Sequence, residues 1–270
     1  MTLEIPRVMG IVNCTPDSFY DGGAHGSSSG QTQHALHLLD SGAEIVDLGG
    51  LSTRPGAQAI SAQEEWERIA PVLEGILSAR PDAIVSIDTY RSEVAERALA
   101  EGASMINDVT GGADPEMWPV VAAARVPYVL MHIQGTPETM QRDPRYDDVV
   151  ADVFTHLLHR VEAARQAGIV DIVADVGFGF GKTLEQNYAL LQNLQAFGEL
   201  GVPVLAGVSR KSMIYKPLKA TPAEALNGTT ALHAWALDRG AHLLRVHDAK
   251  EAAEAIRLHR LLTGESLPQA

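Results

Sequence analysis

Eight short apolar runs alternate with eight segments of helical spacing along the 270 residues, and this alternation restricts the fold more than any other feature. Short apolar runs are typical of buried parallel strands, and apolar residues three and four positions apart are typical of the helices that cover them. The expected strands are Val8–Val12, Ile45–Leu48, Ile84–Ile87, Met105–Ile106, Tyr128–Met131, Ile172–Ala174, Val204–Val208 and Leu243–Val246. The expected helices are Gln31–Ser41, Ala62–Ala79, Arg91–Ala100, Glu116–Ala123, Val149–Ala167, Leu184–Leu194, Pro222–Asp238 and Ala249–Leu262.

This count predicts an α/β fold of the (β/α)8 TIM-barrel type, with residues 1–270 forming a single domain. A doubly wound open sheet is the competing architecture. Glycines that would end a helix shortly before the next strand support the boundaries: Gly42, Gly102, Gly168 and Gly240. Ser61 with Glu64 predicts a capping box, and the glycine- and serine-rich stretches Asp21–Gly30 and Gly49–Ala57 are expected to be mobile loops after strands.

The overall composition narrows the class of protein. A net charge of −13 argues against a nucleic-acid partner or an anionic membrane surface. The single cysteine, Cys14, excludes an internal disulfide framework and suits a reducing compartment. The first seven residues lack the apolar segment of a secretory signal, and no run elsewhere is long enough to span a bilayer. We therefore expect a cytoplasmic protein with small-molecule partners.

Polar residues stand at or just after the end of every expected strand. They are Asn13; Thr53 and Arg54; Asp88; Asn107 and Asp108; His132; Asp175; Ser209, Arg210, Lys211 and Ser212; and Arg245, His247 and Asp248. In a barrel the carboxyl ends of the strands converge on one face, where active sites are found. Any one of these residues could instead occupy a solvated turn, but eight such coincidences are much less probable than one shared site.

One set of these residues suits a nitrogen heterocycle. Asp88, Asn107 and Asp175 offer two carboxylates and an amide, which can recognise a neutral ring rich in N–H donors, such as a pterin or a guanine-like ring. Lys211 can bond a ring atom or neutralise developing charge. The alternatives are that Asp88 caps the following helix and that Lys211 is solvated together with its neighbour Arg210.

A second set suits phosphate. Asn13, Arg54, Arg245 and His247 combine amide and cationic groups, and arginine can hold a phosphate through two parallel hydrogen bonds. The alternative is that Arg245, inside an apolar strand, pairs with a nearby aspartate. No cluster of histidines and cysteines indicates a resident metal, so any cation is expected to be Mg²⁺ held mainly by ligand phosphates, with Asn13 as a candidate ligand.

The stretch IVADVGFGFGKT at 172–183 joins an expected strand to a helix through three glycines. It does not match a P-loop, because Val176 stands where that motif requires its first glycine. It does not match a dinucleotide fingerprint either, because Lys182 stands where that motif requires its last glycine. What remains is a chain that can lie close to a flat ligand. Met131, Phe178 and Phe180 could line a ring pocket, although such residues more often pack in the core.

Taken together, the motifs resemble those of the dihydropteroate synthase family along nearly the whole chain. The matching stretches are GIVNCTPDSFYDGG (10–23), STRPGA (52–57), VSIDT (85–89), IND (106–108), MHIQG (131–135), GFGFGK (177–182), SRKS (209–212) and RVHD (245–248). The resemblance implies a TIM barrel that joins p-aminobenzoate to 6-hydroxymethyl-7,8-dihydropterin pyrophosphate with loss of pyrophosphate. It also implies Mg²⁺, a homodimer, and a target for sulfonamides.

The resemblance further implies a role for each matching residue. The implied pterin site consists of Asp88, Asn107, Met131, Asp175, Phe180, Gly207 and Lys211. Asn13, Arg54, Arg245 and His247 would hold the pyrophosphate and its Mg²⁺, while Phe19, Thr53, Pro55 and Ser212 would form the p-aminobenzoate subsite. The implied catalytic residues are Asp21, Asp88, Asp175, Lys211, Arg245 and His247.

Three positions depart from the family pattern: Tyr20 replaces a serine, Leu51 a glutamate, and Val176 a proline. We expect them to alter loop details rather than activity. Two other functions stay open, namely a non-catalytic pterin-binding barrel and a relative of the methyltetrahydrofolate:corrinoid methyltransferases. STRPG and RVHD argue against the second, because a methyl transfer needs no pyrophosphate pocket.

Overall fold

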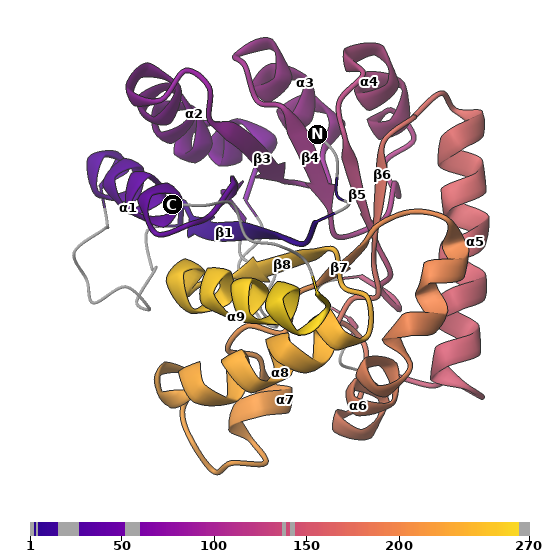
Figure 1. Ribbon diagram of the computed structural model, residues 1–270. Helices are drawn as coiled ribbons and strands as arrows, with labels where there is room; N and C mark the ends of the chain where they lie inside the picture. Colours follow the sequence, from indigo (N-terminus) through magenta and orange to yellow (C-terminus); the bar gives the residue numbers. More distant parts are fainter. Residues whose placement is uncertain are drawn as a thin grey trace.

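In the computed structural model, eight parallel strands close into one barrel in the order β1-β2-β3-β4-β5-β6-β7-β8, and helices surround it (Figure 1). The structure describes residues 3, 5–15, 27–51, 60–136, 139–140 and 144–264. The strands are β1 (Arg7–Asn13), β2 (Ile45–Gly49), β3 (Ile84–Asp88), β4 (Met105–Asp108), β5 (Tyr128–Met131), β6 (Ile172–Asp175), β7 (Val204–Ala206) and β8 (Leu243–Val246). The predicted TIM-barrel class is confirmed and the open sheet is wrong, because β1 also pairs with β8. That all of 1–270 belongs to this domain stays a prediction.

The helices follow the strands in the expected alternation. They are α1 (Ser28–Asp40), α2 (Ala62–Ala79), α3 (Ser92–Ala100), α4 (Met117–Ala124), α5 (Val149–Gln166), α6 (Leu184–Gln192), α7 (Ser212–Tyr215), α8 (Leu226–Asp238) and α9 (Ala249–Leu262), with 3₁₀ turns η2 (Leu194–Leu200) and η3 (Pro222–Glu224). The helix expected over Pro222–Asp238 is divided: a capping box between Thr221 and Glu224 begins η3, and Ala225 ends η3 and precedes α8.

Local signals explain most helix ends. The four glycines predicted to follow helices all have positive φ: Gly42, Gly102, Gly168 and Gly240. The Ser61 hydroxyl accepts from the backbone N–H of Glu64 as expected, whereas the Glu64 carboxylate bonds to Arg68. A reciprocal capping box that the sequence analysis missed joins Thr183 and Gln186 at the start of α6.

Two apolar layers hold the barrel together. The outer core lies between the strands and the helices, and it includes Val176, so this departure from the family pattern is packed in the interior. The inner core fills one end of the barrel and consists of Met9, Ile45, Met105, Val129, Val173, Leu205 and Leu243. Side chains two residues further along the strands point to the same interior. Here they include Asp47, Asn107, Asp175 and Arg245, so polar groups lie directly above an apolar floor.

Candidate active site

The chain leaves β6 through a tight turn that only glycine can form. Asp175 ends the strand and accepts a hydrogen bond of 2.8 Å at Oδ1 from the backbone N–H of Gly177. Gly177 has a φ of 70°, and a Cβ added there would lie 2.0 Å from the carbonyl oxygen of His132. The turn is therefore pressed against the end of β5, which fixes the carboxylate of Asp175 at the mouth of the barrel.

A buried lysine holds this turn in place. The Nζ of Lys182, which is only 4% exposed, donates to the carbonyl oxygens of Gly177 and Phe180, both at 2.9 Å. It also lies 3.1 Å from Nδ1 of His132. Burial and the nearby Lys182 charge lower the pKa of His132 to about 2, so the imidazole is neutral, and its Nδ1 can accept from Lys182 when that lysine is protonated. Burial likewise lowers the pKa of Lys182 to about 7.

Lys211 crosses from the end of β7 towards the same turn. Its ammonium donates to the carbonyl oxygen of Phe178 and lies 4.7 Å from the ring centroid of Phe180. Burial lowers the pKa of Lys211 to about 8, against the opposing effect of Asp175. Burial also raises the pKa of Asp175, against the opposing effect of Lys211. A Cβ on Gly207 would lie 3.6 Å from Lys211 Nζ and 3.9 Å from Asp175 Oδ2, so this glycine leaves the space between them open.

Arg245 of β8 joins two carboxylates in the barrel interior. Its Nε donates to Asp47 Oδ2 at 2.7 Å, and its Nη2 donates to Asp88 Oδ2 at 2.6 Å. Asp47 Oδ2 also accepts from Asn107 Nδ2 at 2.9 Å. Burial raises the pKa of Asp88 to about 7; Arg245 opposes this shift, and the charges of Asp47, Glu65 and Asp108 add to it. The internal pairing that the sequence analysis held as an alternative for Arg245 is thus present.

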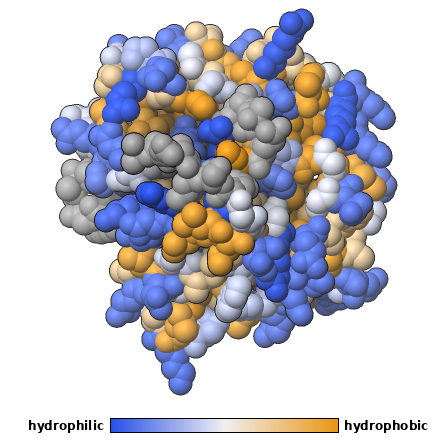
Figure 2. All heavy atoms as spheres, in the orientation of Figure 1, coloured by the Kyte–Doolittle hydropathy of each residue, from blue (hydrophilic) through white to orange (hydrophobic). Residues whose placement is uncertain are grey.

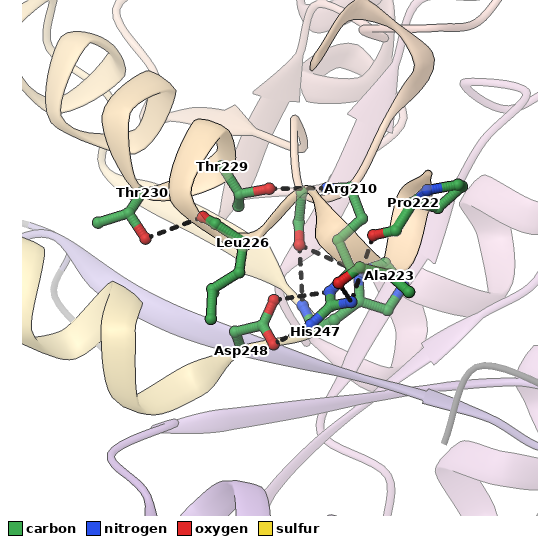
Figure 3. Close-up of polar contacts among 9 residues, drawn as sticks. Arg210, Pro222, Ala223, Leu226, Thr229, Thr230, His247 and Asp248 are labelled. Atoms are coloured by element: carbon green, nitrogen blue, oxygen red, sulfur yellow. Dashed lines mark hydrogen bonds and ion pairs between the residues drawn. The ribbon is translucent and has the colours of Figure 1, made fainter. Parts of the chain in front are cut away.

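Arg210 ties three loops together at the edge of the site (Figure 3). Its guanidinium forms two bonds to Asp248, at 2.8 and 2.6 Å, and reaches the carbonyl oxygens of Pro222 and Ala223. The neighbouring Ser209 hydroxyl accepts from the backbone N–H of His247, and it also lies 3.0 Å from Nδ1 of the His247 ring. The pKa of His247 is lowered to about 3, chiefly by burial and then by Arg245. The alternative in which Arg210 is solvated is wrong, because its guanidinium is paired with Asp248.

A cleft of about 790 Å³ opens over these groups. Seven of the predicted site residues line it: Asn13, Phe180, Gly207, Lys211, Ser212, Arg245 and His247. Asp88, Asn107 and Asp175 connect to them through the contacts above. Met131 is buried at the end of β5, and Phe178 packs in the core rather than against the cleft. Asp88 does not cap the next helix, since Arg91 is the N-cap residue of α3.

Five predicted site residues lie outside the described residues: Phe19, Asp21, Thr53, Arg54 and Pro55. Tyr20 does as well. Leu51 precedes one of these segments, and the adjacent carbonyl oxygen of Gly50 accepts from Arg68 at 3.1 Å. Asp47 was missed by the sequence analysis, because it lies within the run IVDLG, where it was counted as part of an apolar strand. A charged residue inside such a run is the signal that could have identified it.

The chain is similar to known proteins along nearly all of its length. Residues 9–247 match the family model of pterin binding enzymes. The chain is 44% identical to the dihydropteroate synthase of Escherichia coli K12 over 260 residues, which cover 96% of this chain and 92% of that protein. Its fold is similar to that of Xanthomonas albilineans dihydropteroate synthase with 4-aminobenzoic acid, with a TM-score of 0.91, 44% identity, and coverage of 99% and 96% of the two chains.

A second solved structure, the Yersinia pestis dihydropteroate synthase in complex with a sulfonamide drug, matches with a TM-score of 0.93 and 41% identity. The match covers 98% of this chain and 96% of that one. Both the sequence and the fold thus agree over nearly the full length of these enzymes. The chain therefore belongs to the pterin binding enzymes and, among them, to the dihydropteroate synthase family.

Proposed function

We propose that the chain joins p-aminobenzoate to 6-hydroxymethyl-7,8-dihydropterin pyrophosphate and releases pyrophosphate, with the pterin ring bound at the end of β6. Asp175 and Asp88 accept from the ring through their carboxylates and Asn107 accepts through its amide oxygen, while Lys211 donates to a ring nitrogen or oxygen. Phe180, Gly207 and Met131 form the walls. The observation that carries this proposal is the placement of Lys211 beside Asp175, with Gly207 leaving the space next to both open.

Arg245 and His247 are proposed to hold the pyrophosphate, together with Asn13 and with Arg54 from outside the described residues. All three described residues line the same cleft. No group of three or more acidic, histidine or cysteine side chains suited to a metal occurs among the residues that the structure describes. One amide oxygen, from Asn13, fits a Mg²⁺ that is held mainly by substrate phosphates rather than by the protein. Such an ion would supply charge stabilisation for the pyrophosphate.

Ser212 at the start of α7 is proposed to bind p-aminobenzoate, with Phe19, Thr53 and Pro55 from the two undescribed loops. Ser212 lines the cleft next to Lys211, so the second substrate would approach on the side of the pterin that faces β7. The X. albilineans enzyme was solved with 4-aminobenzoic acid, and the Y. pestis enzyme with a sulfonamide drug. We propose that sulfonamides compete for the same subsite here.

The proposed reaction needs no nucleophilic side chain. The carbon–oxygen bond to pyrophosphate breaks first or nearly so, because the electron-rich pterin can share the positive charge. Arg245 and His247 stabilise the departing anion, while Asp175 and Asp21 stabilise the cationic pterin. The amine of p-aminobenzoate then attacks the carbon and loses a proton. His247 contributes as a neutral hydrogen-bond donor, because its pKa is far below neutrality.

We further propose a cytoplasmic homodimer. Within the described residues, no helix is both long enough and apolar enough to cross a membrane. Several large apolar side chains are exposed, including Leu218, Trp235 on α8 and Leu258, Leu261 and Leu262 on α9. Figure 2 shows an apolar patch over α9 on the visible face. Contact between two copies would cover such surface.

The decisive experiment incubates the purified protein with the pterin pyrophosphate, Mg²⁺ and p-aminobenzoate and measures both dihydropteroate and released pyrophosphate. Equal amounts of the two products are expected. Tight pterin binding without product would support the non-catalytic barrel instead. Methyl transfer from methyltetrahydrofolate to a corrinoid would support the remaining alternative. The cleft that contains the cations Arg245 and Lys211 and the neutral donor His247 favours the synthase, because these groups suit a pyrophosphate and a methyl donor carries none.

A further inference from the structure

We propose that Asp47 is a positioning residue that couples the pterin and pyrophosphate subsites through a single oxygen atom. This inference rests on the proposed function, because that function assigns Asn107 to the pterin and Arg245 to the pyrophosphate. Asp47 lies on β2, below the cleft, and is fully buried. It therefore acts on both substrate groups through other side chains.

All the hydrogen bonds that the described residues make to the Asp47 side chain end on Oδ2. This oxygen accepts from Arg245 Nε at 2.7 Å and from Asn107 Nδ2 at 2.9 Å. Oδ1 is buried and has no hydrogen-bond partner among the described residues. The two donors come from β8 and β4, which are not neighbours in the barrel. Asp47 Oδ2 thus fixes the orientations of both Arg245 and Asn107, which no other shared partner among the described residues would link.

The bond to Asn107 determines which amide atom remains for a ligand. A carboxylate only accepts, so the group that faces Asp47 must be the NH₂ of Asn107. The carbonyl Oδ1 of Asn107 is then the atom left to accept an N–H from the pterin ring. Without Asp47, the Asn107 amide could rotate and place its NH₂ group, which only donates, against an N–H of the pterin ring.

The bond to Arg245 acts in the same way on the phosphate side. Asp88 already neutralises part of the guanidinium through Nη2 at 2.6 Å, so a second carboxylate is not needed simply to pair the charge. When Asp88 turns to the pterin, the bond from Nε to Asp47 keeps the guanidinium plane in place. Nη1 forms no hydrogen bond within the described part of the chain, and it is the group that would reach the pyrophosphate.

The test uses two separate probes. 6-Hydroxymethylpterin measures binding at the pterin subsite, which contains Asn107, and inorganic pyrophosphate measures binding at the pyrophosphate subsite, which contains Arg245. Calorimetry measures the binding of each to wild type, Asp47→Asn and Asp47→Ala. We expect Asp47→Ala to weaken both probes at least tenfold. Asp47→Asn, which keeps an acceptor of the same shape, should weaken pyrophosphate more than pterin, because the bond that positions the charged Arg245 loses its charge assistance while the bond to the neutral Asn107 amide loses less.

Ser86→Ala is the matched control. Ser86 is the register neighbour of Asp47 on β3, and its buried hydroxyl likewise has no partner among the described residues. Its removal should leave both affinities within twofold of wild type. Steady-state kinetics on the full chain should show a raised KM for the pterin pyrophosphate and an unchanged KM for p-aminobenzoate in the Asp47 variants.

A merely structural role for Asp47 would lower the thermal midpoint of both variants without changing either affinity, and that result would overturn the inference. So would the weakening of only one probe. If Asp47→Ala does not fold, Asp47→Asn still decides the question through its unequal effect on the probes. Wild type that binds both probes but forms no dihydropteroate would overturn the proposed activity and leave the coupling by Asp47 intact.

Discussion

Arg245 Nη2 lies 2.6 Å from Asp88 Oδ2, so the arginine assigned to pyrophosphate and the carboxylate assigned to the pterin are bound to each other. Sequence alone separated these residues into two sets. The contact means that each substrate group must compete with, or rearrange, a partner that belongs to the other subsite. A substitution of Arg245 is therefore expected to affect Asp88 as well, and a substitution of Asp88 to affect Arg245.

Replacing Arg245 with alanine should remove nearly all turnover, by at least about 100-fold, because the departing pyrophosphate loses its main cation. Arg245→Lys keeps the charge but lacks the planar fork that bonds Asp47 through Nε and Asp88 through Nη2, so we expect it to recover little of the activity. Initial rates of dihydropteroate formation give the measurement, with circular dichroism to confirm folding. Full activity in a folded Arg245→Ala protein would contradict the phosphate assignment.

The pH dependence of kcat/KM for the pterin pyrophosphate should be bell-shaped. Asp88 must be ionised to accept from the ring, and its pKa is raised to about 7, so activity should rise as the pH passes through that value. Lys211 must be protonated, and its pKa is lowered to about 8, so activity should fall above it. In Asp88→Asn, the acidic limb of the residual activity should flatten; an unchanged limb would assign it to another group.

The same two groups should affect stability with opposite signs. Between the ordinary Asp88 value of 3.8 and the raised pKa of about 7, the folded chain holds a proton that the unfolded chain lacks. The Asp88 contribution to the free energy of unfolding therefore decreases as the pH rises through this window. Between about 8 and 10.5 the unfolded chain holds the extra proton at Lys211, so that contribution increases with pH. Urea titrations of wild type and Asp88→Asn across pH 4–8 should differ in slope accordingly.

Two glycines with nearly equal φ angles should differ sharply when replaced by alanine. Gly177 has a φ of 70° and Gly201 a φ of 64°, but a Cβ at 177 would lie 2.0 Å from the His132 carbonyl oxygen, whereas nothing lies within 4 Å at 201. Gly201→Ala should cost only the left-handed strain of about 1–2 kcal/mol. Gly177→Ala should cost about 3 kcal/mol or more and lower pterin affinity. Equal thermal midpoints for the two variants would contradict the close packing of this turn.

The two hydrogen bonds between Arg210 and Asp248 should make the loops after β7 and β8 stabilise each other. Arg210→Lys and Asp248→Asn each break the two-point contact, and we expect a loss of about 1–3 kcal/mol in stability for either variant. The double variant should lose clearly less than the sum, because both changes remove one interaction. Strict additivity in chemical denaturation would show that the pair contributes no joint stabilisation.

The sequence predicted the barrel well because each strand is a short buried run that ends on a polar residue. The same pattern concealed Asp47, whose partners Arg245 and Asn107 are 198 and 60 residues away along the chain. Pairings across a closed sheet depend on register, and no local spacing encodes it. Helix α7 has only four residues, too few for a helical period to be recognised.

Within the described residues, apolar side chains fill the end of the barrel that lies opposite the cleft. Leu205, Leu243 and their neighbours present only apolar side chains at that end, so a ring bound above them meets an apolar surface beneath it. As the last water molecules leave, the charges of Asp175 and Lys211 lose their screening, and each attracts the ligand more strongly. Substrate entry thus strengthens the interaction of these two fixed charges with the bound ring.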